Sequence, residues 1–349
     1  MKQFDGKAFI FTSEDNKYGG MYPVLLSEAL EKPNVFLLER TFSINRALFQ
    51  VISKLFYSER INIALKGFPS RITSRILSKK YTLRRELKEL ANKYSEVYVI
   101  FFNASIKRFY EGKTLQKIKK NYSNVKYIMF FLDPSTMWSA RSAMNLIEEY
   151  PNLFEQIYTV DKYDAKKYGF IYNNTPYSKI EVQKNEENDI YFCGATKNRH
   201  KFIKNIINKL NENNIKSDWD VFYVNKKENG LSELEDVLYV KNPREMKPYC
   251  DVVKTMAKSK CILEIIEGDQ SAMYTLRDYE AVTYGKKLLT NNKNIFEFPY
   301  YDERYMKYFE SVEDIDTDWI KKKMQVNYAG DMKLFSPNYL LEKIVKESH

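Results

Sequence analysis

Short runs of hydrophobic residues alternate with longer amphipathic segments along the chain. The runs predict strands in two series, at 7–12, 34–39, 96–102, 125–132 and 156–160, and again at 189–194, 219–224, 237–240, 261–266 and 287–290. Between the runs, hydrophobic residues at helical spacing predict helices at 44–56, 70–93, 105–121, 138–149, 198–213, 246–258, 275–284 and 338–347. Strands that are hydrophobic throughout and separated by helices are typical of parallel sheets covered on both faces. We therefore expect an α/β protein.

The two series are separated by a polar segment, 173–188, with the sequence NNTPYSKIEVQKNEEN. A chain of 349 residues is also longer than a single hydrophobic core usually supports. We expect a Rossmann-like domain over 1–175, a second one over 189–330, and a helix within 331–349 that can return to the first domain. Two such domains would face each other across a cleft at the carboxyl ends of their strands, where open parallel sheets bind ligands.

Composition narrows the class of protein further. With 44% hydrophobic and 15% aromatic residues, the chain is globular. No hydrophobic run approaches the roughly 18 residues of a membrane span, and the first residues predict a strand and not a signal peptide. Three cysteines without a CxxC spacing fit the reducing cytoplasm. Two histidines exclude a multi-histidine metal site.

Positive charge is concentrated in one segment, 40–93. It holds thirteen Lys and Arg residues against three Glu, so its net charge equals the +10 of the whole chain. Such a segment suits nucleic acid, an anionic membrane or phosphorylated ligands, and a solvated helix face explains it equally well. Its apolar stripe within 44–56 fits the inner face of a membrane or contact with its own sheet. We find no zinc spacing, RNA-recognition motif or helix-turn-helix signature, which disfavours nucleic acid.

One candidate binding segment is 191–202, with the sequence YFCGATKNRHKF. A predicted strand ends at Gly194, and a polar turn leads into a helix whose start carries Lys197, Arg199 and Lys201. Glycine lets the backbone approach a ligand closely, and a helix N-terminus with adjacent cations suits a phosphate or diphosphate. The alternative is an ordinary helix with a basic first turn.

A second candidate segment is 262–292, in which a strand is expected to end near Glu267 and a loop containing Gln270 leads to a helix. The helix begins around Thr275, and its free N–H groups suit phosphate oxygens. Arg277 and Glu280 are three residues apart, so they share one helical face. Arg277 is a candidate for contact with a diphosphate, and Glu280 for the hydroxyls of a ribose. The alternative is an exposed surface ion pair on a helix that stops at Gly285.

The pattern R-x-x-E-A-x-x-x-G-K-K-L-L-T-x-N at 277–292 resembles bacterial surface-polysaccharide glycosyltransferases of the GT-B fold, including enzymes of lipopolysaccharide and capsule assembly. The resemblance extends to Gly194 with Arg199 and to 156–170. In such enzymes the C-terminal domain holds the nucleotide-sugar, and the glutamate of the E-A-x-x-x-G segment binds the ribose. The resemblance therefore implies ribose binding for Glu280, and it implies that Thr275, Leu276 and Arg277 lie near the diphosphate. It also implies that Lys241 and Met246 flank the nucleobase.

The resemblance implies transfer of a sugar from a nucleotide-diphosphate sugar to a glycan or lipid-linked glycan acceptor. Many retaining enzymes of this fold carry a second glutamate eight positions before the ribose-binding one. Here that position is Ala272, and the nearest polar residues are Asp269 and Gln270. This departure favours an inverting mechanism.

An inverting transfer needs a general base for the acceptor hydroxyl, usually a carboxylate or histidine. In the first domain, Asp133 follows a strongly hydrophobic strand and precedes a proline. Glu14 and Asp15 follow the first strand and precede a Gly-Gly pair. We expect Asp133 to be the general base, and Asp15 and Glu14 are the next candidates for this role. A turn or helix-capping aspartate is the alternative for each.

We expect neither a metal nor a cofactor besides the nucleotide-sugar co-substrate. The pairs Asp218–Asp220 and Asp316–Asp318 lack the strand-end context of a metal-binding Asp-x-Asp and are expected at the surface. Helix dipoles and basic side chains would instead stabilise the leaving group. The alternatives to a glycosyltransferase are a nucleic-acid-binding or membrane-peripheral non-catalytic protein that uses 40–93, and a GT-B-fold sugar-nucleotide epimerase.

Overall fold

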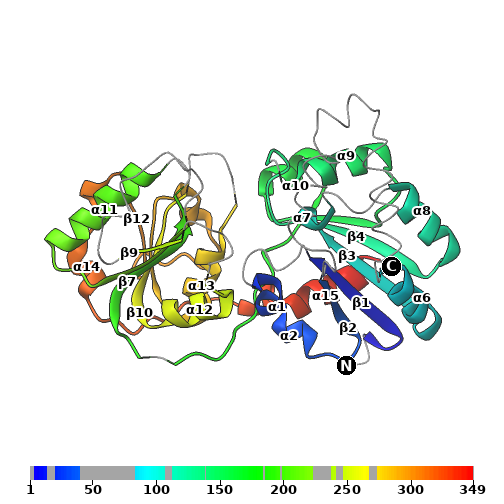
Figure 1. Cartoon of the computed structure of the whole chain (residues 1–349), viewed down its shortest axis with the longest axis horizontal. Coiled ribbons are helices and arrows are strands. Elements are labelled where there is room, and N and C mark those ends of the chain that lie inside the picture. The colour runs from blue at the N-terminus through cyan, green and yellow to red at the C-terminus, as the bar shows by residue number, and fades with distance from the viewer. Residues whose placement is uncertain are drawn as a thin grey trace. The chain divides into compact units, whose positions relative to one another are not determined.

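The computed structural model describes residues 4–13, 20–39, 83–106, 112–137, 139–183, 185–196, 199–222, 237–240, 247–266 and 273–348. The chain forms two compact units (Figure 1). The N-terminal unit consists of Met1–Asn16, Glu28–Thr175 and Pro337–His349, and the C-terminal unit of Lys17–Ser27 and Pro176–Ser336. The segment Lys17–Ser27, expected in the first domain, therefore belongs to the C-terminal unit. There the Ser178 hydroxyl donates to the Leu25 carbonyl over 2.8 Å.

The N-terminal unit is built on a parallel sheet, for which the described residues give six strands in the order β2-β1-β3-β4-β5-β6. The strands are β1 (Lys7–Ser13), β2 (Val35–Glu39), β3 (Glu96–Phe102), β4 (Val125–Phe131), β5 (Gln156–Thr159) and β6 (Ile171–Tyr172). The helices are α2 (Ser27–Leu30), which belongs to this unit from Glu28 on, α6 (Leu83–Lys93), α7 (Asn103–Ile106), α8 (Gly112–Asn121), α9 (Arg141–Glu149), α10 (Lys162–Tyr168) and α15 (Pro337–Glu347).

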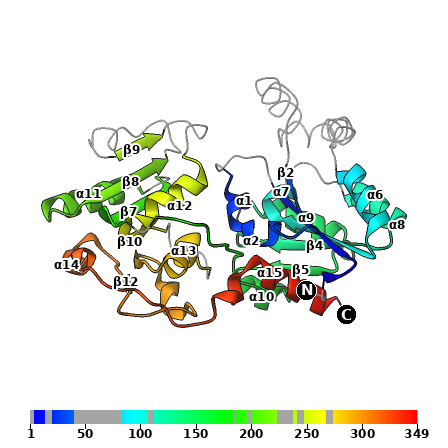
Figure 2. The same ribbon diagram turned by 90° about the horizontal axis from the view of Figure 1, so that it is seen from below.

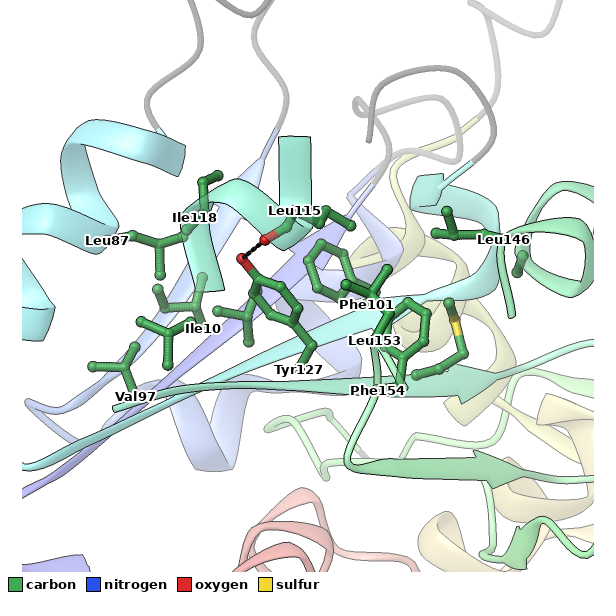
Figure 3. Close-up of a cluster of buried hydrophobic side chains, with 14 of the residues drawn as sticks. Ile10, Leu87, Val97, Phe101, Leu115, Ile118, Tyr127, Leu146, Leu153 and Phe154 are labelled. Atoms are coloured by element: carbon green, nitrogen blue, oxygen red, sulfur yellow. Dashed lines mark hydrogen bonds between the residues drawn. The ribbon is translucent and has the colours of Figure 1, made fainter. Parts of the chain in front are cut away.

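One face of this sheet packs against α6, α8 and α9 to form a hydrophobic core (Figure 3). Leu115 and Ile118 of α8 lie over Tyr127 of β4, whose hydroxyl donates to the Leu115 carbonyl over 3.2 Å. Helix α15 binds the unit through the strand β5, since the Gln156 side chain donates to the Ile344 carbonyl over 3.0 Å. The C-terminal helix thus returns to the first unit, as the sequence allowed.

The C-terminal unit has a second parallel sheet, with six strands among the described residues in the order β12-β11-β10-β7-β8-β9 (Figure 2). The strands are β7 (Asn188–Ala195), β8 (Ser217–Phe222), β9 (Val237–Val240), β10 (Ser259–Glu264), β11 (Lys287–Thr290) and β12 (Met306–Tyr308). The helices are α1 (Met21–Leu25), α11 (His200–Glu212), α12 (Tyr249–Ala257), α13 (Leu276–Tyr284) and α14 (Thr317–Lys321), with 3-10 helices at Lys293–Glu297, Val312–Asp314 and Met332–Phe335.

Helices α11 and α14 cover one face of this second sheet, and α12 and α13 the other (Figure 1). Counted within the unit, the strand order is that of the dinucleotide-binding Rossmann sheet, and it reverses direction between β7 and β10. The predicted α/β class with two parallel sheets is confirmed. Among the described residues, no helix combines the length and hydrophobicity of a membrane span.

Each predicted strand has a counterpart, but several details were wrong. Strand β10 ends at Glu264 and not near Glu267, and β8 begins at Ser217, two residues before the predicted start at 219, so it contains Asp218 as well as Asp220. Of the helix predicted at 105–121, the described residues give the end of α7 and the whole of α8, and 107–111 lie outside them. The short elements β6, β12 and α10 were not predicted. The helix predicted at 44–56, and most of the basic segment 40–93, lie outside the described residues.

Candidate functional site

The carboxyl ends of β7 and β10 are neighbours in the centre of the second sheet, with Phe192 in register with Leu263. The strand order reverses at this point. Ligands of open parallel sheets bind outside the carboxyl ends of the strands where the order reverses, because the flanking loops diverge there. We therefore describe the side chains that follow β7 and β10 as the candidate donor site.

Arg277 lies at this point, in the first turn of α13. Its Nη2 donates to the Cys193 carbonyl of β7 over 3.2 Å, and its Nη1 forms an ion pair with Glu280. The Glu280 side chain is 0% exposed, against 16% for Arg277. Glu280 also accepts a hydrogen bond of 2.6 Å from the hydroxyl of Tyr249 on α12. The alternative of an exposed surface pair is therefore wrong, because the pair is buried and links α13 to β7 and α12.

The electrostatics of the pair follow from this burial. Burial alone would lower the pKa of Arg277, but the Glu280 carboxylate raises it well above its ordinary value. The guanidinium therefore stays charged at the switch point of the sheet. A buried ion pair is costly to separate, since either charge left alone would be desolvated without a partner.

The start and end of α13 are both defined by local chemistry. Thr275 is the N-cap, and its hydroxyl accepts from the Arg277 amide over 3.1 Å. Asp278 completes a capping box by accepting from the Thr275 amide over 2.6 Å. At the other end, Gly285 has a φ of 61° and stops the helix, which suits a residue without a Cβ. Thr275 and Gly285 thus lie at the helix ends that the sequence predicted.

A buried carboxyl at the end of β10 was not predicted. The Glu264 carboxyl accepts from the hydroxyls of Thr275 and Thr290. Burial raises the pKa of Glu264, although the two hydroxyl hydrogen bonds oppose the rise. Burial, followed by repulsion from Glu264, raises the pKa of Asp278 well above its ordinary value. The one available signal was a glutamate inside the otherwise hydrophobic run CILEII.

Arg199 bridges the two strand ends directly. Its guanidinium donates to the Ala195 carbonyl of β7 and to the Ile265 carbonyl after β10. The Thr196 hydroxyl, which is buried beside it, has no hydrogen-bond partner among the described residues. Buried hydroxyls are nearly always paired. An unpaired one at the switch point is a group that a ligand can satisfy.

The remaining predicted donor residues fall into three groups. A Cβ on Gly194 would lie 2.9 Å from the Phe192 ring, so this glycine is explained by contact within its own strand. Lys201 is exposed on the first turn of α11, and Leu276 is half-buried at the start of α13. The last group lies outside the described residues and comprises Lys197, Lys241, Met246 and Gln270.

The expectation of surface aspartates was wrong for Asp220. This residue is 1% exposed on β8 and accepts from Lys247 over 2.8 Å and from the hydroxyl of Tyr191. Its place inside the strand turns the side chain towards the layer occupied by α12. Asp316 instead caps α14 by accepting from the Trp319 amide over 2.9 Å. The ion pair with Lys247 thus accounts for one oxygen of Asp220, and helix capping accounts for Asp316.

In the N-terminal unit, Asp133 lies at the carboxyl end of β4 and is half-buried. It accepts a hydrogen bond of 3.1 Å from the side-chain amide of Asn103, which follows β3. The predicted place of Asp133 at a strand end is thus observed. Glu14 and Asp15 lie outside the described residues.

The chain matches no protein-family model and no curated protein sequence. Among solved structures, UGT2 of Phytolacca americana, complexed with UDP-2-fluoro-glucose and pterostilbene, is 10% identical over 98% of this chain and 93% of that chain, with a TM-score of 0.44. HepE of Anabaena, in complex with UDP and glucose, is 11% identical over 97% and 93%, with a TM-score of 0.49. The UDP-GlcNAc 2-epimerase of Neisseria meningitidis, bound to UDP-GlcNAc, is 13% identical over 98% and 94%, with a TM-score of 0.38. Since these TM-scores lie below 0.5, function has to be argued from the site.

Proposed function

We propose that the C-terminal unit binds a nucleotide-diphosphate sugar and that the chain is a glycosyltransferase. The observation that carries the proposal is the position of Arg277. Its guanidinium lies at the end of β7, where the strand order reverses, and in the first turn of a helix. A diphosphate is the ligand that a fixed guanidinium and a helix N-terminus favour together. The sequence motif around Glu280 supports a nucleotide-sugar in particular.

Within this proposal, Glu280 acts on the ligand through Arg277. Both carboxylate oxygens already accept hydrogen bonds, from Tyr249 and from Arg277, and the side chain is fully buried. The ribose contact that the family resemblance implies would require one of these partners to move, so it stays a prediction. Holding Arg277 in place needs no movement.

The reaction we propose is an inverting sugar transfer. The acceptor hydroxyl attacks the anomeric carbon, its proton passes to Asp133, and the bond from that carbon to the diphosphate oxygen breaks. The new negative charge on the nucleoside diphosphate is stabilised by Arg277 and the N-terminus of α13. We expect no metal requirement. As acceptor we propose a glycan or lipid-linked glycan of a bacterial surface polysaccharide, with the protein in the cytoplasm or at the inner face of the membrane.

Calorimetric titration with UDP, GDP, CDP, dTDP and ADP tests the donor site. We expect wild type to prefer one diphosphate and Glu280→Gln to weaken that binding by about tenfold or more, because the released guanidinium loses its fixed position. The matched control is Asp251→Asn on α12, which removes an exposed ion pair with Lys254 that also spans three residues. This control should bind like wild type.

The outcomes separate the rival functions. Absence of binding by every diphosphate at millimolar concentration removes the basis for a glycosyltransferase and for an epimerase alike. Equal loss of binding in Glu280→Gln and Asp251→Asn would show that the effect is not specific to the Arg277 site. Duplex nucleic acid that binds instead, with an affinity that collapses as salt rises, would support the nucleic-acid alternative.

A further inference from the structure

The amide of Asn103 has only one orientation that satisfies its neighbours. Asn103 is 0% exposed, and one end of its amide faces the Leu132 backbone N–H at 2.9 Å. A backbone N–H can only donate, so the end that faces it must be the oxygen. The amide nitrogen therefore faces Asp133 and donates to its Oδ2 over 3.1 Å. The side chain of Asn103 therefore hydrogen-bonds both to the backbone of the turn after β4 and to the Asp133 carboxylate in that turn.

The same turn is held from the opposite side by Asp164 of α10. The Ser135 hydroxyl donates to Asp164 over 2.7 Å, and the Ser135 amide donates to the second oxygen over 2.5 Å. Asp164 is 2% exposed. Its own amide donates to Asp161, the N-cap of α10, over 3.0 Å. The residues on either side of Asp133 are therefore fixed to two different helices.

We propose that Asn103 is a positioning residue for Asp133, and that the Ser135–Asp164 contact holds the same turn from its other side. The inference rests on the proposed function, in which Asp133 takes the proton of the acceptor hydroxyl. A base is effective only when it is held within hydrogen-bond reach of that hydroxyl. A displacement of about 1 Å can cost on the order of a hundredfold in rate. The buried amide supplies this constraint without touching the substrate.

The test is a double-mutant cycle in the full-length protein with Asn103→Asp and Asp133→Asn. Asn103→Asp keeps an oxygen for the Leu132 amide, so the turn keeps its backbone hydrogen bond. It also places a second carboxylate oxygen against Asp133. The readout is release of nucleoside diphosphate from UDP-, GDP-, CDP-, dTDP- and ADP-hexoses, with water as acceptor. We expect Asn103→Asp to lower kcat by about tenfold to a hundredfold, with KM for the donor unchanged. In the Asp133→Asn background it should cause no further loss.

The matched control is Asn124→Ala at the amino end of the same strand. Asn124 also makes two hydrogen bonds through its side chain, to the carbonyls of Ala91 over 2.8 Å and Tyr94 over 2.9 Å. Its loss should lower the urea midpoint but leave kcat unchanged. Multiplicative losses in the Asn103–Asp133 cycle, a raised donor KM, or an equal fall of kcat in Asn124→Ala would each overturn the positioning role. A wild type that releases no nucleoside diphosphate overturns the proposed function first, and the positioning role with it.

Discussion

The buried Arg277–Glu280 pair makes a quantitative prediction about the stability of the C-terminal unit. Replacing Glu280 by Gln leaves the guanidinium without its counter-ion, and replacing Arg277 by Met leaves the carboxylate with Tyr249 alone. Each single variant therefore leaves one charge buried without its partner. The double variant leaves no charge unpaired, although the Cys193 carbonyl loses the hydrogen-bond donor that Arg277 provided.

The magnitudes follow from the burial of the pair. Breaking a buried pair by removing one partner costs about 3–5 kcal/mol, whereas replacing both partners is often close to neutral. The lost hydrogen bond to Cys193 adds about 1–2 kcal/mol in the double variant. Because Arg277 keeps 16% of its side-chain surface exposed, water relieves part of its penalty. We therefore expect a coupling free energy of at least about 2 kcal/mol between the two substitutions.

Urea unfolding followed by tryptophan fluorescence measures this coupling. Trp219 and Trp319 belong to the C-terminal unit, whereas Trp138 belongs to the N-terminal one. A Trp138→Phe background therefore makes the signal report on the unit that contains the pair. The exposed Asp251–Lys254 pair serves as the control cycle, with an expected coupling below about 0.5 kcal/mol. Losses at Arg277 and Glu280 that add to within about 0.5 kcal/mol would show that the two buried charges do not stabilise each other.

Two further predictions concern charges away from the site. Burial opposes ionisation of Glu96, but hydrogen bonds from Lys126 and Lys7 lower its pKa to about 2 from 4.5. The stability that this lowered pKa contributes is therefore complete above about pH 4.5 and is lost as the pH falls towards 2. The urea midpoint of Glu96→Gln should decline less steeply than that of wild type between these two pH values. An equal decline in both proteins would contradict this prediction. Lys287 donates to the carbonyls of Trp319, Ile320 and Lys322 at the end of α14. Lys287→Met should lower the free energy of unfolding by about 2–4 kcal/mol. The control Lys293→Met, at a side chain 56% exposed, should change this free energy by less than about 0.5 kcal/mol. Equal effects of the two substitutions would show that the three hydrogen bonds of Lys287 contribute nothing to stability.

The strands were predictable because most are hydrophobic on both faces, which leaves an unbroken run in the sequence. The edge strand β12, Met306–Tyr308, is too short and too polar to leave such a run. Helix α10 was missed for a related reason, since KYDAKKY has little hydrophobic periodicity. Its boundaries were nevertheless marked, by the cap at Asp161 and by Gly169 with a φ of 70°.

The candidate site was predictable only where it is local in sequence. Arg277 and Glu280 lie on one helix, so their spacing in the sequence predicted the pair. Its burial did not follow from spacing, because Tyr249, 31 residues before Glu280, covers it from another helix. The partnership of Asn103 with Asp133 spans 30 residues and depends on two strands lying side by side. Such contacts require the sheet to be assembled before they can be identified.

Hydrogen exchange in the presence of a nucleotide-sugar tests whether the switch point of the second sheet binds this ligand. Each of the UDP-, GDP-, CDP-, dTDP- and ADP-hexoses would be added in turn to the full-length protein. We expect one of them to slow amide exchange in peptides covering 191–202, 259–266 and 273–285, which contain the strand ends and the start of α13. Unchanged exchange in these peptides with every nucleotide-sugar, or protection confined to the N-terminal unit, would contradict it.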